Sequence, residues 1–156
     1  MTRRIQLVAV ALITLAYLVI AMLYAFKTPA WQVPDEPAHY NYVAQVATNG
    51  CCPKLQPGDW DNAYLESIKG AKFSPASLQG RLNTIQYEDH QPPLFYLLMA
   101  PLYSVSGGDL TALRLFSVLL GAGVVITAWA VVRVIFPAQP WLALATAAFV
   151  AFLPQH

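Results

Sequence analysis

Residues 5–25 read IQLVAVALITLAYLVIAMLYA, and this stretch decides the fold of the chain. A helix that crosses a bilayer needs roughly 20 apolar residues, because each residue adds about 1.5 Å of length. The run reaches that length without a charged residue, and Arg3 and Arg4 precede it. It is also longer than the apolar core of a secretory signal, which has about 7–15 residues. We therefore predict an uncleaved helix that anchors the chain in a membrane.

The composition agrees with a membrane protein. Hydrophobic residues make up 57% of the chain and charged residues 11%, whereas a soluble domain carries about 25% charged residues. A second run, at 112–136, is long enough to cross a bilayer, and the runs at 93–105 and 141–153 are shorter. We predict an all-α integral membrane protein with about four transmembrane helices, the last of them incomplete. The net charge of +1 and the lack of a basic cluster in the sequence argue against a nucleic-acid partner.

These runs divide the chain into three parts. Residues 1–26 are the first transmembrane helix, 27–91 are a large outer loop, and 92–156 hold transmembrane helices two to four, truncated at the end of the sequence. Arg3 and Arg4 place the N-terminus in the cytoplasm by the positive-inside rule. The loop 27–91 is then extracytoplasmic, in a multi-pass protein of the inner or plasma membrane. Residues 93–105 return inward and 112–136 run outward, which puts Arg114 at the favoured inner end and Arg133 at the outer end.

The outer loop is predicted to carry short amphipathic helices that lie in the plane of the membrane interface. Residues 36–48 form one of them, with Asp35 as the N-cap. Its polar stripe consists of Asn41, Gln45 and Thr48, spaced four and three residues apart. Residues 61–69 form a second short helix in the same loop.

Two further patterns have structural interpretations. Cys51 and Cys52 are neighbours, which fits no zinc pattern because no second Cys/His pair accompanies them. We interpret them as two small loop residues or as a vicinal disulfide. Ser117 and Gly121 are four residues apart in the run at 112–136, a spacing that lets a neighbouring helix approach closely.

Asp35 and Glu36 are the first candidate site, because they follow the first span where the chain leaves the lipid. A carboxylate there can act as a general base towards a substrate whose anchor stays in the membrane. It can also bind a metal, provided that other donors join it. The structural alternative is a simple helix cap, which is common for Asp before a helix that starts with Pro. Both roles fit an adjacent pair, since one acid can cap while the other faces the site.

A second polar cluster, Glu88–Asp89–His90, precedes the run at 93–105 at the other end of the loop. We expect the loop to bring His39, Asp35, Glu88 and His90 into one cleft at the interface. The alternative is that polar groups at a helix end are simply solvated. Aromatic residues of the region are interpreted as an interface belt, with stacking on a sugar ring as the alternative; they are Trp31, Tyr40, Tyr87 and Tyr96.

Three motifs in order, VPDEPAHY at 33–40, HQPPLFY at 90–96 and LRLFS at 113–117, resemble the N-terminal module of GT-C-type integral membrane glycosyltransferases. The likeness is to the bacterial branch near protein O-mannosyltransferases and aminoarabinose transferases. The resemblance implies transfer of a sugar from a polyprenyl-phosphate donor to an acceptor on the outer face. It assigns catalysis, or support of a divalent cation, to Asp35 or Glu36. We predict His39, Tyr40, Glu88 and His90 as substrate-binding residues.

The leaving phosphate needs a cation, and the loop offers Lys54, Lys69, Lys72 and Arg81 for that role. The partners implied are membrane lipid, a lipid-linked sugar and other membrane subunits. Family members have more spans, so we expect these residues to be part of a longer enzyme and inactive alone. The alternative function is a non-catalytic small membrane subunit, a shortened glycosyltransferase-like copy packed in a larger complex. A transporter fits less well, because no acid lies within a span.

Overall fold

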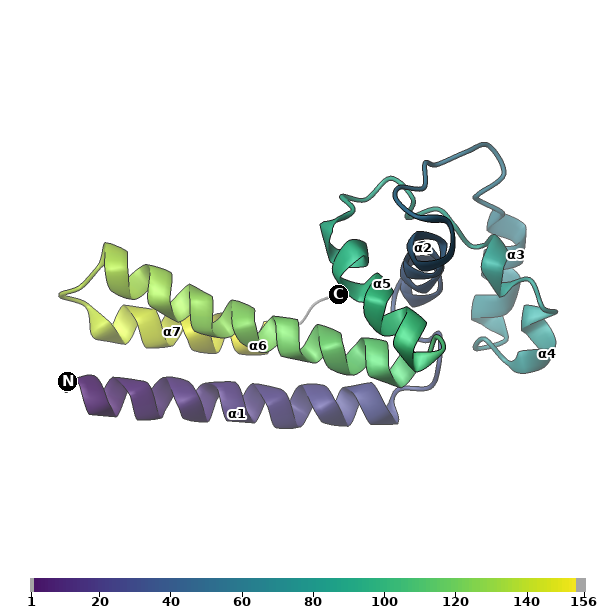
Figure 1. Cartoon of the computed structure of the whole chain (residues 1–156). Coiled ribbons are helices and arrows are strands. Elements are labelled where there is room, and N and C mark those ends of the chain that lie inside the picture. The colour runs from purple at the N-terminus through teal and green to yellow at the C-terminus, as the bar shows by residue number, and fades with distance from the viewer. Residues whose placement is uncertain (1, 154–156) are drawn as a thin grey trace. The chain divides into compact units, whose positions relative to one another are not determined.

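A computed structural model describes residues 2–153 of the chain, and the regular secondary structure within them is helical, with loops between the helices (Figure 1). The predicted all-α class is confirmed, since no strand occurs within the described residues. Residues 154–156 of the predicted third part lie outside them. The helices are α1 (Arg3–Lys27), α2 (Glu36–Asn49), α3 (Asn62–Gly70), α4 (Pro75–Leu78), α5 (Leu94–Ser106), α6 (Leu110–Ile135) and α7 (Pro140–Phe152), with a 3₁₀ turn at Leu82–Thr84.

The chain folds into two compact units. Met1–Lys27 and Arg114–His156 form the helical unit, which contains α1, most of α6 and α7. Thr28–Leu113 form the loop unit, which contains α2 to α5. The boundary differs from the predicted one at residue 91, because α5 belongs to the loop unit.

In the helical unit, α1 and α6 run antiparallel. At one end, the Arg114 guanidinium donates a hydrogen bond to the Ala25 carbonyl at 3.1 Å. Further along, Gly121 of α6 faces Tyr17 of α1, and Val10, Val125 and Ala147 share one buried cluster. The last turn of α1 and the first turns of α6 are therefore at the same end of the unit. A cation suits that place, because the last carbonyls of a helix lack partners and carry partial negative charge.

Among residues 2–153, two helices are long and apolar enough to cross a membrane: α1 with 25 residues and α6 with 26. The helices α5 and α7 have 13 residues each, about 20 Å at 1.5 Å per residue, whereas the hydrocarbon core is about 30 Å thick. A single crossing by α5 would also put the end of α1 and the start of α6 on opposite sides of a bilayer. In the structure Ala25 is paired with Arg114, and the predicted crossing at 93–105 is not shown.

Small residues allow close packing of the helical unit, as the spacing of Ser117 and Gly121 predicted. A Cβ built on Gly121 would collide with the hydroxyl of Tyr17. Gly123, two residues further, has no atom near the corresponding position. The close approach is therefore specific to one glycine and one tyrosine.

In the loop unit, α2 packs along α5. On its other side α2 contributes Ala38 to a core cluster with Tyr64, Leu65, Ile68 and Ile85. This helix is therefore covered on two sides by its own loop. The bounds of α2 and α3 agree closely with the predicted helices at 36–48 and 61–69.

The predicted polar stripe of α2 does not face solvent along its length. Asn41 is 5% exposed, and its side-chain amide donates to the carbonyls of Leu82 and Ile85 at 2.6 and 2.8 Å. Gln45 is half-buried and donates to Asp89, while Thr48 is exposed. Asn41 and Gln45 of the stripe bind residues 82–91, the return segment of the loop, because buried acceptors need donors.

Cys51 and Cys52 are joined by a disulfide, one of the two interpretations of the pair. The bridge lies just after Gly50, which ends α2 with φ of 83° and donates its amide to the Val46 carbonyl. The pair therefore belongs to the exposed connection between α2 and α3.

Candidate functional site

Asp35 stands at the start of α2 in the left-handed region, with φ of 57° and ψ of 4°. Its carbonyl accepts the His39 amide at 3.0 Å, but its side chain makes no capping hydrogen bond. The Oδ1 atom instead accepts from the Tyr87 hydroxyl at 2.7 Å. The prediction that this side chain caps α2 is therefore wrong. A positive φ is uncommon outside glycine, although Asp tolerates it better than most residues. In this structure the residue with positive φ has an exposed carboxylate that points to Tyr87.

Glu36 has a different role, although it is the next residue. Its Oε2 atom accepts the backbone amide of Trp31 at 2.7 Å and so closes the bend that leads into α2. The residue is half-buried, whereas Asp35 is exposed. Of the two adjacent acids, Asp35 has the carboxylate that solvent and a substrate can reach.

His39 lies one turn further along α2, where its Nδ1 is 2.8 Å from the Tyr96 hydroxyl. Which of the two groups donates depends on the tautomer of the imidazole. Tyr96 also stacks on Tyr42, with ring centroids 3.6 Å apart and planes at 14°. The imidazole is thus oriented by a buried tyrosine that is itself held by a second ring.

The side chain of Tyr40 makes its contacts within the loop unit. Its hydroxyl donates to the carbonyl of Gly108 at 2.9 Å, and its ring meets the edges of Trp31 and Tyr103 at 5.0 and 5.5 Å. Burial, followed by the hydrogen bond with Tyr103, raises the pKa of Tyr40 to about 12. These contacts link the entry of α2 to the end of α5.

The second acidic cluster separates into three environments. Glu88 accepts from the side chain of Gln91 at 2.8 Å, and the exposed His90 has its Nδ1 3.0 Å from the Tyr87 carbonyl. Asp89 is 4% exposed, and both of its oxygens lie 3.0 Å from Nε2 of Gln45. Burial raises the pKa of the Asp89 carboxyl, and the hydrogen bond from Gln45 opposes that shift.

Tyr87 and Tyr96 connect the two clusters. Asp35 is bonded to the first and His39 to the second, so the segments 35–39 and 87–96 are in contact through tyrosine hydroxyls. A cleft formed by Asp35, His39, Glu88 and His90 stays a prediction. Burial and the bond to Asp35 raise the pKa of Tyr87, and the hydroxyl of a tyrosine is a hydrogen-bond donor at neutral pH even without such a shift. The exposed ring of Trp60 packs edge-on against Tyr87 at 4.9 Å.

Sequence reasoning assigned Tyr87 and Tyr96 to an interface belt and so missed their hydrogen bonds to Asp35 and His39. It also gave Asp89 no separate role from its two neighbours. The sequence held one indication of their role, because Tyr87 directly precedes Glu88 and Tyr96 follows six residues after His90. Their partners lie more than 50 positions earlier, however, and no local pattern pairs residues over that separation.

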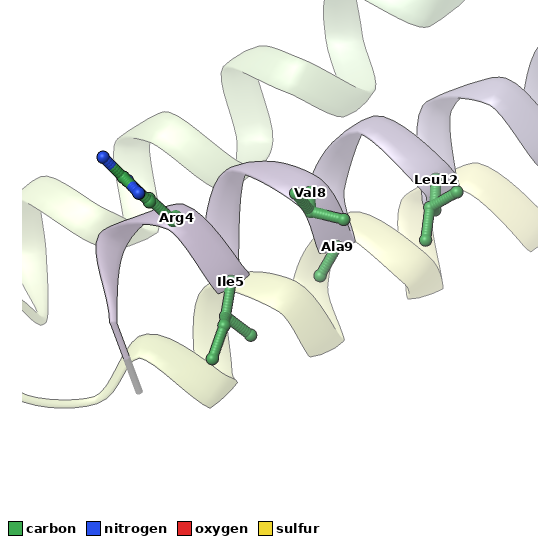
Figure 2. A pocket seen from close by; sticks show the side chains of 5 residues that line it. All are labelled: Arg4, Ile5, Val8, Ala9 and Leu12. Atoms are coloured by element: carbon green, nitrogen blue, oxygen red, sulfur yellow. The ribbon is translucent and has the colours of Figure 1, made fainter.

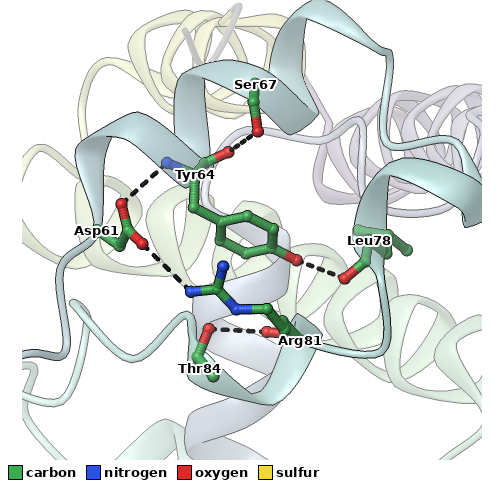
Figure 3. A network of polar contacts seen from close by, with 6 residues as sticks. All are labelled: Asp61, Tyr64, Ser67, Leu78, Arg81 and Thr84. Carbon is green, nitrogen blue, oxygen red and sulfur yellow. Dashed lines mark hydrogen bonds and ion pairs between the residues drawn. The ribbon is translucent and has the colours of Figure 1, made fainter.

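Arg81 belongs to a structural network around α3 rather than to Asp35 (Figure 3). Its guanidinium is 3.2 Å from Asp61 and lies over the ring of Tyr64 at 4.4 Å. Asp61 caps α3 through the Tyr64 amide at 2.9 Å, and this bond, with Arg81, lowers the pKa of Asp61. Of the predicted phosphate-binding cations, Lys69 likewise pairs with Glu66 at 3.4 Å.

The carboxylates and imidazoles do not form a metal cage. Among residues 2–153, no three His, Cys, Asp or Glu side chains lie close enough to hold one ion. Asp35 and Glu36 face Tyr87 and Trp31 respectively, so the pair does not fit a divalent cation by itself. We assign no step of the chemistry to a metal.

Two hollows lie in the helical unit and have apolar walls. One runs along the first turns of α1 between Arg4 and Leu12 (Figure 2). The other lies between α6 and α7 and has Gly123, Thr127 and Thr146 in its wall. Neither lining contains a carboxylate or an imidazole. The candidate groups for acid–base chemistry are therefore the carboxylates and imidazoles of the loop unit.

Comparison of the chain with protein-family models, with curated proteins and with solved structures finds no match in any of the three. A functional assignment for this chain therefore depends on its own residues and their geometry.

Proposed function

We propose that this chain is the N-terminal module of a GT-C-type membrane glycosyltransferase, which transfers a sugar from a polyprenyl-phosphate donor to an acceptor on the outer face. The order of the three motifs at 33–40, 90–96 and 113–117 supports the proposal. The two long apolar helices that flank the loop unit support it as well.

The observation that carries the proposal is the exposure, side-chain partner and backbone conformation of Asp35. Its carboxylate is exposed, makes no cap and is oriented by the Tyr87 hydroxyl. Its backbone is in a left-handed conformation, of a kind that concentrates at functional sites. A cap would need none of these features, whereas a general base needs an accessible carboxylate in a fixed orientation.

We propose that α1 and α6 cross the bilayer and that α7 begins a third crossing, in place of the four spans predicted from the sequence. Arg3, Arg4 and Arg133 then share one end of the antiparallel helices, which the positive-inside rule places in the cytoplasm. Arg133 then agrees with the rule, whereas Arg114, at the other end of α6, lies on the outer side. Residues 28–113, with Asp35, lie on the outer side.

In the proposed reaction, Asp35 takes the proton of the acceptor as the acceptor oxygen attacks the anomeric carbon and the polyprenyl phosphate leaves. His39 binds and orients substrate, together with Glu88 and His90 of the return segment. Glu36 and Tyr40 maintain the bend and the helix pairing on which the position of Asp35 depends. Asp35 is thus the catalytic residue of the pair, and Glu36 is a positioning residue.

The test uses the protein expressed from its complete reading frame, in membrane vesicles that retain native acceptors. Radiolabelled polyprenyl-phosphate-mannose is the probe, and transfer of label from it is measured. Asp35→Asn should lower the rate by about 100-fold or more, the range typical of a lost general base. Glu66→Gln, an exposed acid of α3, serves as the control and should leave the rate unchanged. Full activity of a folded Asp35→Asn protein would reject the assignment.

A non-catalytic membrane subunit is the second candidate. It is favoured by the internal bonds of Glu36 and Tyr40, which a purely structural module would also need. Purification from native membranes at natural expression level distinguishes the two. A stoichiometric partner, together with unchanged transfer in Asp35→Asn, would establish the subunit role.

A further inference from the structure

The helix α5 has two faces with different environments. Tyr96, Met99 and Ala100 are buried on the side that packs against α2. The opposite side is exposed and apolar: Leu94 is 69% exposed, Leu97 42%, Leu98 50% and Val105 87%, and Pro101 is exposed between them.

The exposed residues form one continuous stripe. Positions 94, 98, 101 and 105 are spaced four, three and four residues apart, and such positions lie on the same face of a helix. A charged side chain occurs nowhere in Leu94–Ser106. A solvated helix would carry polar groups on this face, so water is a poor partner for it.

The chain itself limits how far this stripe lies from the membrane. Only residues 107–109 separate the end of α5 at Ser106 from the start of α6 at Leu110. Four Cα steps span at most about 14 Å, and the headgroup layer is about 5–8 Å thick on each side of the hydrocarbon core. The last turn of α5 is therefore held at the membrane surface if α6 crosses the bilayer.

In the proposed topology the same helix does not cross the bilayer, because it has only 13 residues and because α1 and α6 pair antiparallel. The helix α5 thus has an apolar stripe, is joined closely to a proposed span and does not itself cross. These are the features of a helix that lies in the membrane interface.

We propose that α5 lies on the outer leaflet and that the stripe Leu94, Leu97, Leu98, Pro101 and Val105 is buried among lipid acyl chains. The partner is the lipid bilayer. This inference rests on the membrane crossing by α6 included in the proposed function, and it does not require the glycosyltransfer reaction. Because α2 packs on the other face of α5, the lipid contact sets the height of Asp35 above the bilayer.

The experiment places spin labels at single introduced cysteines in the full protein reconstituted in phosphatidylcholine vesicles. The background carries Cys51→Ser and Cys52→Ser, and each variant is checked for an unchanged thermal midpoint. Leu98→Cys and Val105→Cys probe the stripe. Val124→Cys of α6 is the lipid control and Lys54→Cys of the loop is the water control. Accessibility to oxygen and to a water-soluble nickel chelate is measured for each label.

Labels at Leu98 and Val105 should resemble the Val124 label, with high oxygen access and nickel access at least several-fold below that of Lys54. Nickel access at both stripe positions equal to that of Lys54, with a lipid-like Val124, would overturn the lipid contact and leave the crossing by α6 intact. Water-like access at Val124 would overturn the crossing and the proposed topology together. Loss of transfer activity has no bearing on these readings.

Discussion

In the helical unit, small residues let side chains and helices approach each other, whereas in the loop unit polar side chains bind distant backbone carbonyls. Gly121 accommodates Tyr17 between α6 and α1. Asn41, by contrast, binds two carbonyls of the return segment, and Tyr40 binds a third. Apolar packing of this kind suits a segment surrounded by lipid, where helix interfaces are enriched in small residues.

The difference matters for function, because the candidate catalytic groups are found where polar bonds hold the structure. A hydrogen bond fixes direction as well as distance, so Tyr87 and Tyr96 orient Asp35 and His39. The apolar contacts among α1, α6 and α7 depend less on the direction of approach than hydrogen bonds do. We therefore expect substitutions that break a polar contact or crowd a fixed side chain in the loop unit to cost more stability than a comparable change of volume in the helical unit.

The largest effect is expected for Asn41→Leu. The substitution keeps the branched shape of the side chain but replaces its amide by two larger methyl groups, so the Ile85 carbonyl loses the Asn41 donor and the Leu82 carbonyl keeps only the Ile85 amide. A buried acceptor left unsatisfied costs about 1–3 kcal/mol, and the larger methyl groups add strain in a packed site, so the loop unit should lose about 2–3 kcal/mol of stability. Hydrogen exchange of the loop unit measures the change. Asn49→Ala, at the exposed end of the same helix, is the control, and equal protection in both variants would contradict the role of Asn41.

The next effect is expected for Gly108→Ala. Gly108 has φ of 77°, and a Cβ would lie 2.7 Å from the Tyr40 hydroxyl and 3.1 Å from the Tyr103 ring. Strain and overlap together should cost about 2 kcal/mol, measured as a lower thermal midpoint in detergent.

Gly107→Ala is the matched control, because Gly107 also has positive φ but has no atom near the Cβ position. It should lose only about 1 kcal/mol for the backbone strain. Adding Tyr40→Phe to Gly108→Ala should restore part of the loss by removing the colliding oxygen. No difference between the two alanine variants would show that the contact with Tyr40 is unimportant.

A smaller effect is expected in the helical unit for Gly121→Ala. The new methyl group collides with the hydroxyl end of Tyr17, which can shift, so the net cost should be about 1 kcal/mol. Gly123→Ala meets open space and should be neutral or stabilising, since alanine favours helix. Thermal unfolding in detergent compares them, and Tyr17→Phe should rescue the first. Identical midpoints would remove the basis for a close packing of α1 on α6.

The smallest effect concerns Asp89, whose pKa burial raises above its ordinary range. A raised carboxyl pKa means that the folded state holds the proton more tightly than the unfolded state. The stabilisation is complete below the unfolded pKa and is lost as pH rises through the folded pKa. Asp89→Asn removes this titration, so the stability of wild type relative to the variant should fall between acidic and neutral pH. Thermal midpoints of both proteins across that range provide the measurement.

A parallel pH dependence in wild type and Asp89→Asn would contradict a buried titrating carboxyl at this position. Glu66→Gln, which removes an exposed acid of α3, should leave the pH dependence unchanged and is the control.

Some elements could be predicted from local pattern alone. The apolar runs at 5–25 and 112–136 identify α1 and α6, and the amphipathic spacing identifies α2. The role of Asp35 could not be predicted in this way, because cap and site residue share the same local sequence and the deciding contact is with Tyr87. The crossing at 93–105 stays a prediction for a similar reason: hydropathy indicates affinity for lipid but does not distinguish a helix that crosses a bilayer from one whose second face packs on α2.

By itself, the amino-acid sequence determined the helical class, the two long apolar helices and the polar loop between them, because hydropathy and periodicity act over neighbouring residues. Tertiary structure decided that α1 and α6 run antiparallel, that α5 joins the loop unit, and that Tyr87 rather than the start of α2 receives the side chain of Asp35. These features depend on contacts between residues 50 to 90 positions apart. Only the packed chain brings such residues within the few ångströms over which hydrogen bonds and van der Waals contacts act.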